Sequence, residues 1–140
     1  ATAAINMANG ALVSSSATLG SQHQLSRLRF CFEHLTAESN HSPYDPGRDP
    51  WQMTASSRRK DYEIAAALAE FTPSPAGFSG QFMDLYRHLQ SGSPLTVTLA
   101  DARRSLELVT AMYASASTGQ PERLPIDVTH PRYTDWRPQS

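Results

Sequence analysis

Residues 98–119 read TLADARRSLELVTAMYASASTG and form the most clearly bounded element of the chain. Thr98 can cap the first turn of a helix, and Asp101 stands where a capping box needs its second member. Gly119 is the expected left-handed stop, and Pro121 prevents the helix from resuming. Apolar residues recur at steps of three and four along the stretch, which predicts one buried stripe: Leu99, Ala102, Leu106, Val109, Tyr113 and Ala116. The opposite side is expected to face water, with Arg103, Arg104, Glu107 and Thr110.

A helix with one apolar stripe needs a surface to lie on, and residues 1–19 predict the first part of a sheet. Asn9-Gly10 favours a two-residue type I′ hairpin turn, because both central residues of that turn need positive φ. This turn would place Met7 opposite Leu12 and Asn6 opposite Val13. One face would then carry Ala3, Ile5, Met7, Leu12, Ser14 and Ser16, and the other Ala4, Asn6, Ala8, Ala11, Val13, Ser15 and Ala17.

Neither face of this hairpin carries a charge, and a sheet with two uncharged faces is normally covered on both sides. Helices can cover one face. The other needs a second sheet, either in this chain or in a partner, and we expect a second copy of the chain to cover it, with Leu12 or Val13 at the centre of the contact.

The rest of the chain predicts further strands and then helices. Residues 25–32 alternate between apolar and polar side chains, Glu33-His34 is a turn candidate, and residues 35–38 and 51–55 are strand candidates around a loop at 39–50. The secondary structure of residues 62–71 is ambiguous. Ser79 is the expected N-cap of a helix that ends at Gly92 and Pro94. Residues 124–128 are a candidate edge strand. This order is typical of an α+β fold. We predict a single domain of residues 1–140, with a mainly antiparallel sheet, two helices packed on one face and the other face open for oligomerisation.

Length and composition limit the function classes. The chain has 140 residues and a formal net charge of −1, and it shows no basic stripe with interleaved aromatics, which argues against nucleic acid. The single cysteine, Cys31, fits a reducing and therefore cytoplasmic location. No apolar run is long enough to span a membrane, and no leader segment is visible. The chain opens without Met and inside a predicted strand, so we interpret it as a domain of a longer protein.

The residues alone support no active site. The five histidines lack metal-ligand spacing and Cys31 has no CxxC partner, so no metal site is predicted. His41, Asp45 and Asp49 share a loop that could bind a cation or simply be solvated. Residues 77–80, GFSG, could offer backbone amides to an anion or form an ordinary helix start. There is no GxSxG, GxGxxG or GxxxxGK[ST] motif, so we predict no catalytic residue and no cofactor-binding residue in this chain.

Three segments together resemble one family. They are TAAINMANGALVSSSATLG, LRFCFEHLTAESN and GQFMDLYRHLQSGSPLTVTLADARRSLELVTAMYASASTGQPERLP. They are similar to the carboxy-terminal domain of the glucose–fructose oxidoreductase / inositol dehydrogenase / MocA family of NAD(P)-dependent dehydrogenases, most specifically over residues 81–125. In that family an amino-terminal Rossmann domain binds the cofactor and supplies a catalytic lysine, and a helix early in the second domain supplies an Asp/His pair. Neither region is in this sequence, so no functional residue is carried over.

The resemblance implies a large antiparallel sheet whose helix face helps to build the substrate cleft and whose open face pairs subunits. The chain would be the substrate-side and oligomerisation domain of an oxidoreductase that acts on a sugar or polyol with NAD or NADP, incomplete without its Rossmann partner. Position alone suggests cleft candidates between residues 58 and 81: Arg58, Arg59, Phe78, Ser79 and Gln81. The alternative is a free-standing, non-catalytic α+β module that dimerises through its sheet. A GxGxxG unit upstream would favour the first hypothesis, and an initiator Met directly before Ala1 the second.

Overall fold

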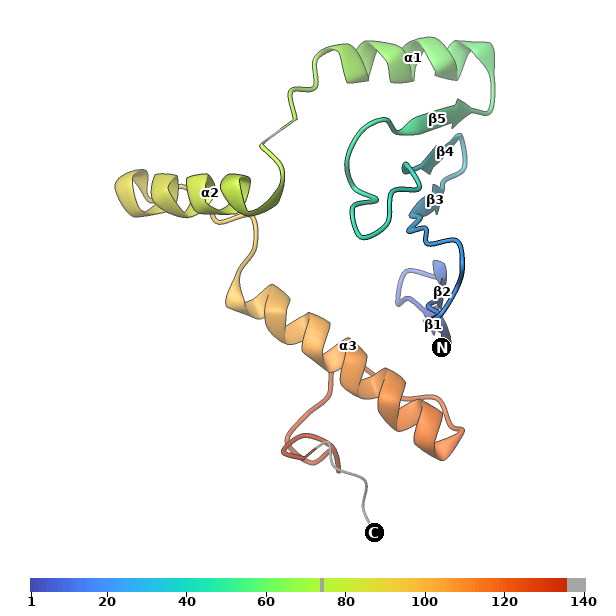
Figure 1. The fold of residues 1–140 in the computed structure, drawn as a ribbon, viewed down its shortest axis with the longest axis vertical. Coiled ribbons are helices and arrows are strands. Elements are labelled where there is room, and N and C mark those ends of the chain that lie inside the picture. Colours follow the sequence, from blue (N-terminus) through green and yellow to red (C-terminus); the bar gives the residue numbers. More distant parts are fainter. Residues whose placement is uncertain (74, 136–140) are drawn as a thin grey trace. The chain divides into compact units, whose positions relative to one another are not determined.

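The computed structural model describes residues 1–73 and 75–135 (Figure 1). Its strands are β1 (Thr2–Asn6), β2 (Leu12–Ser16), β3 (Arg29–Cys31), β4 (Leu35–Glu38) and β5 (Gln52–Ala55), and its helices are α1 (Arg58–Ala69), α2 (Gly77–Ser91) and α3 (Leu99–Thr118). The strands form two small antiparallel sheets, β1–β2 and β3–β4–β5. The predicted α+β class and the antiparallel pairing are therefore confirmed.

The chain divides into two compact units, each described here by itself. The terminal unit holds residues 1–17 and those from Asp84 onward, and the middle unit holds residues 18–83. The single-domain organisation and the packing of two helices on one sheet face stay predictions. In the part of the chain that the structure describes, no helix is both long and apolar enough to cross a membrane.

The hairpin of the terminal unit forms where it was predicted, but with a different turn. Gly10 N donates to Met7 O and Met7 N donates to Ala11 O, each at 2.9 Å, so the loop has three residues. Gly10 has a φ of 86°, whereas Asn9 is not among the described residues with positive φ. This is the geometry of a type I turn followed by a glycine in the left-handed conformation. An Asn-Gly pair is compatible with this three-residue loop as well as with the two-residue type I′ turn.

The longer loop shifts the hairpin register by one residue. Ile5 lies opposite Val13 and Asn6 opposite Leu12, so the predicted opposition of Met7 to Leu12 and of Asn6 to Val13 is wrong. A shift of one residue moves side chains to the other face. Val13 therefore shares a face with Ile5, and Leu12 shares the other face with Asn6. The Leu12 residue is 80% exposed and Val13 41%.

The sheet of the middle unit contains the strands predicted at residues 35–38 and 51–55, whereas the alternation over residues 25–32 overestimated its strand, which is confined to Arg29–Cys31. Phe32 N donates to Leu35 O at 2.8 Å and closes the expected turn at Glu33-His34. The register places Phe30, Ala37 and Met53 in one row and Arg29, Glu38 and Gln52 in the next. Successive residues of a strand point to opposite faces, so this sheet has an apolar face and a polar face.

The ambiguous residues 62–71 belong to a helix that starts earlier than the apolar pattern. Ser57 is its N-cap, and the Ser57 hydroxyl accepts a hydrogen bond from Lys60 N at 3.3 Å. The helix, α1, lies against β5 (Figure 1). The polar, basic residues that follow Ser57 therefore form its first turn, where apolar periodicity gives no signal.

α2 begins two residues before the expected cap. Gly77 has a φ of 69°, and this left-handed conformation lets the chain turn into the helix at that point. Ser79 therefore lies inside the first turn, and its assignment as the cap is wrong. The stop is as predicted, because Gly92 has a φ of 70° and its N–H donates to His88 O at 2.8 Å. His88 lies in the last turn, and its Nδ1 is 2.6 Å from Ser93 O.

α3 has the predicted bounds but a different buried side. Thr98 and Asp101 form the capping box, and Gly119 stops the helix with a φ of 69°. The residues it buries are Thr110, Ala111 and Ala114. The predicted stripe is largely exposed, with Leu99, Leu106, Val109 and Tyr113 all open to solvent in this chain. The prediction of a buried stripe, and of Thr110 facing water, is wrong.

The segment that follows α3 explains which side of the helix is buried. Arg132 Nη2 contacts Ser117 Oγ at 3.5 Å, and Ile126 is buried. Small side chains such as Ala114 let a returning segment come close, and Thr110 satisfies its hydroxyl by donating to Leu106 O at 2.8 Å. The predicted edge strand at residues 124–128 is absent from the described structure, since Asp127 Oδ1 accepts from Thr129 N at 2.8 Å and turns the chain there.

Candidate functional site

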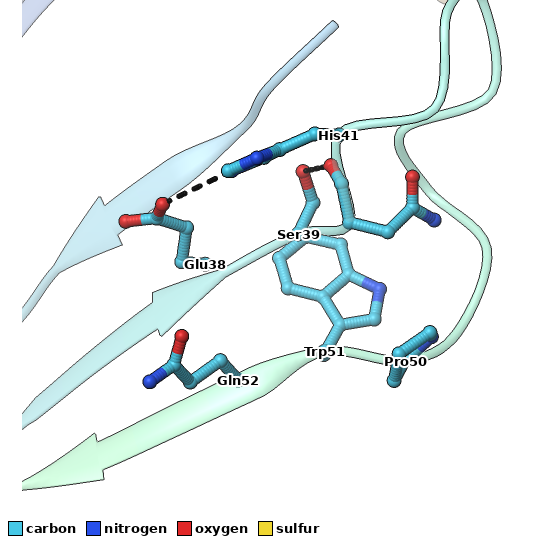
Figure 2. Close-up of a pocket in the computed structure, with 7 residues that line it drawn as sticks. Glu38, Ser39, His41, Pro50, Trp51 and Gln52 are labelled. Carbon is cyan, nitrogen blue, oxygen red and sulfur yellow. Dashed lines mark hydrogen bonds and ion pairs between the residues drawn. The ribbon is translucent and has the colours of Figure 1, made fainter. Parts of the chain in front are cut away.

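A hollow of about 290 Å³ lies where β4 ends and β5 begins (Figure 2). Glu38 and Gln52 are register partners in the antiparallel pair, so the end of one strand and the start of the next lie side by side. The loop between them returns the chain to the same place. The residues that line the hollow are Glu38, Ser39, Asn40, His41, Pro50, Trp51 and Gln52.

Glu38 is the central polar residue of the hollow. Its carboxylate oxygens lie 3.3 Å from His41 Nε2, 3.5 Å from Arg29 Nε and 3.9 Å from Arg27 Nη1. Strong charge-assisted hydrogen bonds are shorter, at about 2.7–2.9 Å. The carboxylate is therefore held in place by three partners and still has lone pairs free for short hydrogen bonds.

Gln52 adds a second planar polar group beside this carboxylate. Its side chain is exposed and makes no hydrogen bond to any residue that the structure describes. Directly paired residues on one face of an antiparallel sheet have Cβ atoms about 5 Å apart. The Glu38 and Gln52 side chains therefore start from neighbouring positions on the polar face of the sheet, although the Glu38 carboxylate contacts Arg29 of β3 and His41.

The wall of the hollow is fixed by hydrogen bonds and ring stacking. The Trp51 ring stacks on Phe30 with centroids 6.1 Å apart, and Trp51 Nε1 donates to Gly47 O at 3.1 Å. The buried Ser39 hydroxyl accepts from Leu28 N at 2.9 Å and donates to Asn40 O at 2.8 Å. A side chain locked in this way keeps its position when a ligand binds.

The Asn40 side chain stabilises the loop and does not offer its amide to the hollow. Asn40 Oδ1 accepts from Ser42 N at 2.7 Å, and Asn40 Nδ2 donates to Arg48 O. Both halves of the amide are therefore already bonded. The groups that remain able to bind a ligand are the Glu38 carboxylate, the His41 ring and the Gln52 amide.

A second hollow, of about 400 Å³, lies in the terminal unit beside the last turns of α3. His130 Nε2 is 3.6 Å from Glu122 Oε2, and His130 Nδ1 accepts from Arg132 N at 3.1 Å. Because a backbone N–H donates to Nδ1, the proton of a neutral ring sits on Nε2 and faces the carboxylate. These contacts tie the returning segment together, so the polar groups here serve the fold.

Three carboxylates with lowered pKa values are also part of the fold. Hydrogen bonds from the Thr98 hydroxyl lower the pKa of Asp101, and those from the Thr129 hydroxyl lower the pKa of Asp127. The Lys60 ammonium, 2.6 Å from Glu63 Oε2, lowers the pKa of Glu63. A cap, a turn and a helix surface account for all three.

The cleft candidates lie at the starts of two helices. The Arg58 guanidinium is 6.0 Å from the centroid of the Tyr62 ring, and Arg59 Nε donates to Glu63 Oε1 at 3.2 Å. Phe78, Ser79 and Gln81 are exposed in the first turns of α2. None of the five lines either hollow described above, so their role in a cleft stays a prediction.

The residues of the first hollow were not singled out from the sequence, except for His41 in its polar loop. The usable signal was the pair of strands at 35–38 and 51–55, because an antiparallel pairing across the loop puts Glu38 near Gln52. The loop forms no metal site: among the described residues, no group of three or more His, Cys, Asp and Glu could hold a metal ion. His41 contacts Glu38, and Asp45 Oδ2 lies 3.0 Å from Arg48 Nε.

Compared with known proteins, the chain matches no family model, and it has no significant match to a curated protein or a solved structure.

Proposed function

We propose that this chain is the substrate-side and oligomerisation domain of a cytoplasmic oxidoreductase that transfers a hydride between a sugar or polyol and NAD or NADP. The proposal rests on the resemblance of residues 81–125 to such domains. It is also supported by the order of the elements: a hairpin, antiparallel strands, α2, and then the capped α3. Hydride transfer needs a cofactor held beside the substrate, and in this proposal a Rossmann domain outside the present sequence holds it.

The exposed apolar stripe of α3 carries the proposal. Leu99 is 90% exposed, Leu106 59% and Val109 39%, although all three were expected to be buried. Each large apolar side chain that becomes fully buried contributes about 1.5–3 kcal/mol. A capped helix that keeps such a stripe open in its own unit is suited to pack against another surface. In this proposal that surface comes from the rest of the protein.

α2 repeats this pattern. Phe78, Phe82, Tyr86 and Leu89 are large, apolar or aromatic, and exposed. The cleft candidates Phe78, Ser79 and Gln81 stand on this helix, and Arg58 and Arg59 begin α1. In the proposed protein these helix starts border the substrate.

The alternative function, a non-catalytic module that dimerises through its sheet, is favoured by one observation. Leu12 is largely exposed on a hairpin face that it shares with Ala4 and Asn6, and this face has no charge. An exposed, uncharged strand face is typical of a surface that pairs with another copy.

The test uses the complete reading frame. We expect a GxGxxG unit upstream of Ala1, NAD- or NADP-dependent oxidation of at least one sugar or polyol by the whole protein, and no measurable cofactor binding by residues 1–140 alone in isothermal titration. An initiator Met directly before Ala1, or a dissociation constant of a few micromolar for NAD with this chain alone, would overturn the proposal.

A matched pair of substitutions tests the α3 surface in the whole protein. Leu106→Lys places a charge in the exposed stripe, and we expect it to reduce assembly or activity at least tenfold, because burying an unpaired charge is costly. Ser105→Lys, on the adjacent residue, is the control and should leave both unchanged. Equal effects of the two substitutions would show that the stripe is not a packing surface.

A further inference from the structure

We propose that Asn9 deamidates spontaneously in the folded chain, through a cyclic imide formed with Gly10, and that position 9 thereby becomes a mixture of aspartate and isoaspartate. Asn9 and Gly10 are both exposed, in the loop that joins β1 to β2. The other asparagines of the chain, Asn6 and Asn40, do not precede a glycine. This modification site does not depend on the proposed oxidoreductase function.

The reaction needs only water as a co-reactant. A base removes the proton of Gly10 N, and the nitrogen lone pair attacks Asn9 Cγ, which closes a five-membered ring because the two atoms belong to neighbouring residues. The bond from Cγ to Nδ2 then breaks, and that nitrogen takes up a proton and leaves as ammonia. Water adds to one of the two imide carbonyl carbons and gives a proton to the departing ring nitrogen. Cleavage at Cγ yields aspartate, and cleavage at the main-chain carbonyl yields isoaspartate.

The geometry of the loop favours attack on the Asn9 side chain. Ala11 N donates to Asn9 Oδ1 at 3.0 Å, so it polarises the carbonyl and can stabilise the negative charge that develops on the oxygen during attack. Asn9 Nδ2 makes no hydrogen bond to any residue that the structure describes, so the leaving nitrogen is not held in place. Gly10 has no side chain to shield its nitrogen, and a Cβ built there would meet nothing within 4 Å.

One contact in the loop opposes the reaction. Gly10 N donates to Met7 O at 2.9 Å, and this hydrogen bond must open before the nitrogen can attack. β1 and β2 form a sheet of only two strands, and a two-stranded hairpin is marginally stable by itself. Exposed loops open at a low cost in free energy. The Gly10 nitrogen is therefore released often enough for the folded chain to react.

Asn40 provides an internal comparison. Asn40 Oδ1 accepts from Ser42 N at 2.7 Å, the same contact that Asn9 Oδ1 makes with the N–H two residues ahead. The residue after Asn40 is His41, whose side chain hinders the approach to its nitrogen, and Asn40 Nδ2 donates to Arg48 O. Asn40 should therefore react much more slowly than Asn9, although the two carbonyls are polarised alike.

The two products should affect the hairpin differently. Aspartate keeps an oxygen that can accept from Ala11 N, and it adds the first charged side chain to residues 1–19. Isoaspartate carries the main chain through the side-chain carbon and so lengthens the loop, whose length sets the hairpin register. We therefore expect isoaspartate to disturb the pairing of Ile5 with Val13.

The test is incubation of the folded chain in buffer made with H₂¹⁸O, followed by digestion in ordinary water and tandem mass spectrometry. Each deamidation in the incubation adds one ¹⁸O atom, which distinguishes it from deamidation during digestion. We expect label at position 9 in both products, at a rate within about tenfold of the rate in the urea-unfolded chain. Asn6 and Asn40 should acquire label at least about tenfold more slowly than Asn9, because only Asn9 precedes a residue without a side chain.

Three variants assign the reaction to the named atoms. Gly10→Ala should slow the labelling of position 9 at least about tenfold in the urea-unfolded chain, where the strain of alanine at the left-handed φ of Gly10 plays no part. Asn9→Gln keeps an amide but would have to close a larger ring, so position 9 should stay unlabelled. Asn6→Gln is the matched control in the same hairpin and should leave the labelling of Asn9 unchanged. Circular dichroism checks that the variants incubated without urea are folded.

Nuclear magnetic resonance spectra of the aged, ¹⁵N-labelled chain should show new amide signals for residues 5–13 that grow with the amount of isoaspartate. A folded wild-type chain that stays unlabelled at position 9 while the unfolded chain reacts would overturn the inference. Equal labelling of Asn9 and Asn40 in the folded chain, or labelling of unfolded Gly10→Ala as fast as the unfolded wild type, would overturn it as well. Unchanged hairpin signals in a sample rich in isoaspartate would contradict the expected effect on the register.

Discussion

Thr98 and Asp101 bond to each other across the first turn of α3. Asp101 Oδ2 accepts from Thr98 N at 2.9 Å and from the Thr98 hydroxyl at 2.7 Å, and Asp101 N lies 3.4 Å from Thr98 Oγ1. The Thr98 N–H, which the helix itself leaves unbonded, is thereby satisfied, and Asp101 N, which also donates to Thr98 O at 3.1 Å, gains a second acceptor. The start of the longest helix is thus fixed by two side chains three residues apart.

We expect the capping box to weaken in acid. Hydrogen bonds from Thr98 lower the pKa of Asp101 below its ordinary value of 3.8. A depressed pKa means that the carboxylate stabilises the fold above that value and loses this contribution as the pH falls through the folded-state pKa. Thermal unfolding between pH 7 and pH 2 should show a smaller acid loss for Asp101→Asn than for the wild type. Identical acid losses would contradict the assignment.

At neutral pH the cap itself can be tested. Thr98→Ala removes the side-chain acceptor of the N-cap and should lower the free energy of unfolding by about 0.5–2 kcal/mol. Thr134→Ala, at an exposed residue outside any helix or strand, is the control and should change it by less than about 0.5 kcal/mol. Urea unfolding curves measure both.

Gly80 is the least replaceable glycine in the middle unit. A Cβ added there would lie 1.8 Å from the Pro75 carbonyl oxygen, a backbone atom that cannot move aside cheaply. Gly80→Ala should destabilise the chain by about 1–3 kcal/mol or more. Gly47→Ala is the matched control, because a Cβ at Gly47 meets nothing within 4 Å. Urea midpoints that rank Gly47→Ala as the more damaging change would show that α2 starts differently.

The buried side of α3 predicts an unusual ranking of substitutions. Ala114 is only 3% exposed, so Ala114→Leu should overpack the contact with the returning segment and cost about 1–3 kcal/mol. Leu106→Ala, at a residue that is 59% exposed, should cost less than about 1 kcal/mol in this chain. Denaturant unfolding of both variants checks the order, and a larger loss for Leu106→Ala would mean that the helix is rotated.

Self-association is expected through the hairpin face that carries Leu12. Leu12→Arg should shift the chain from dimer to monomer in sedimentation equilibrium, while circular dichroism stays unchanged. Val13→Arg should instead impair folding, since Val13 shares the partly buried face of Ala3 and Ile5. Leu19→Arg, at a fully exposed residue outside the strands, is the control. A wild-type chain that is monomeric at tens of micromolar would contradict the expectation.

The sequence by itself determined the elements whose signals are local. Thr98, Asp101 and Gly119 fixed the ends of α3, and Gly92 fixed the end of α2, because caps and left-handed stops depend on residues within one turn. The turn at Glu33-His34 and the strands on either side of it also followed from alternation and turn chemistry. These are the parts of the fold that were predicted correctly.

Tertiary structure decided the features that depend on contacts between residues distant in the sequence. Asn9-Gly10 predicted a hairpin, but two turns compete for that pair, and the one-residue difference in register reassigned Leu12 and Val13 between faces. Periodicity showed that α3 has an apolar stripe, whereas the structure buries Thr110, Ala111 and Ala114, and Ala114 lines a hollow together with the returning segment. Glu38 and Gln52 meet only because two strands pair across a loop. Helix ends follow from neighbours in the chain, but burial and the hollow depend on which segments come together in space.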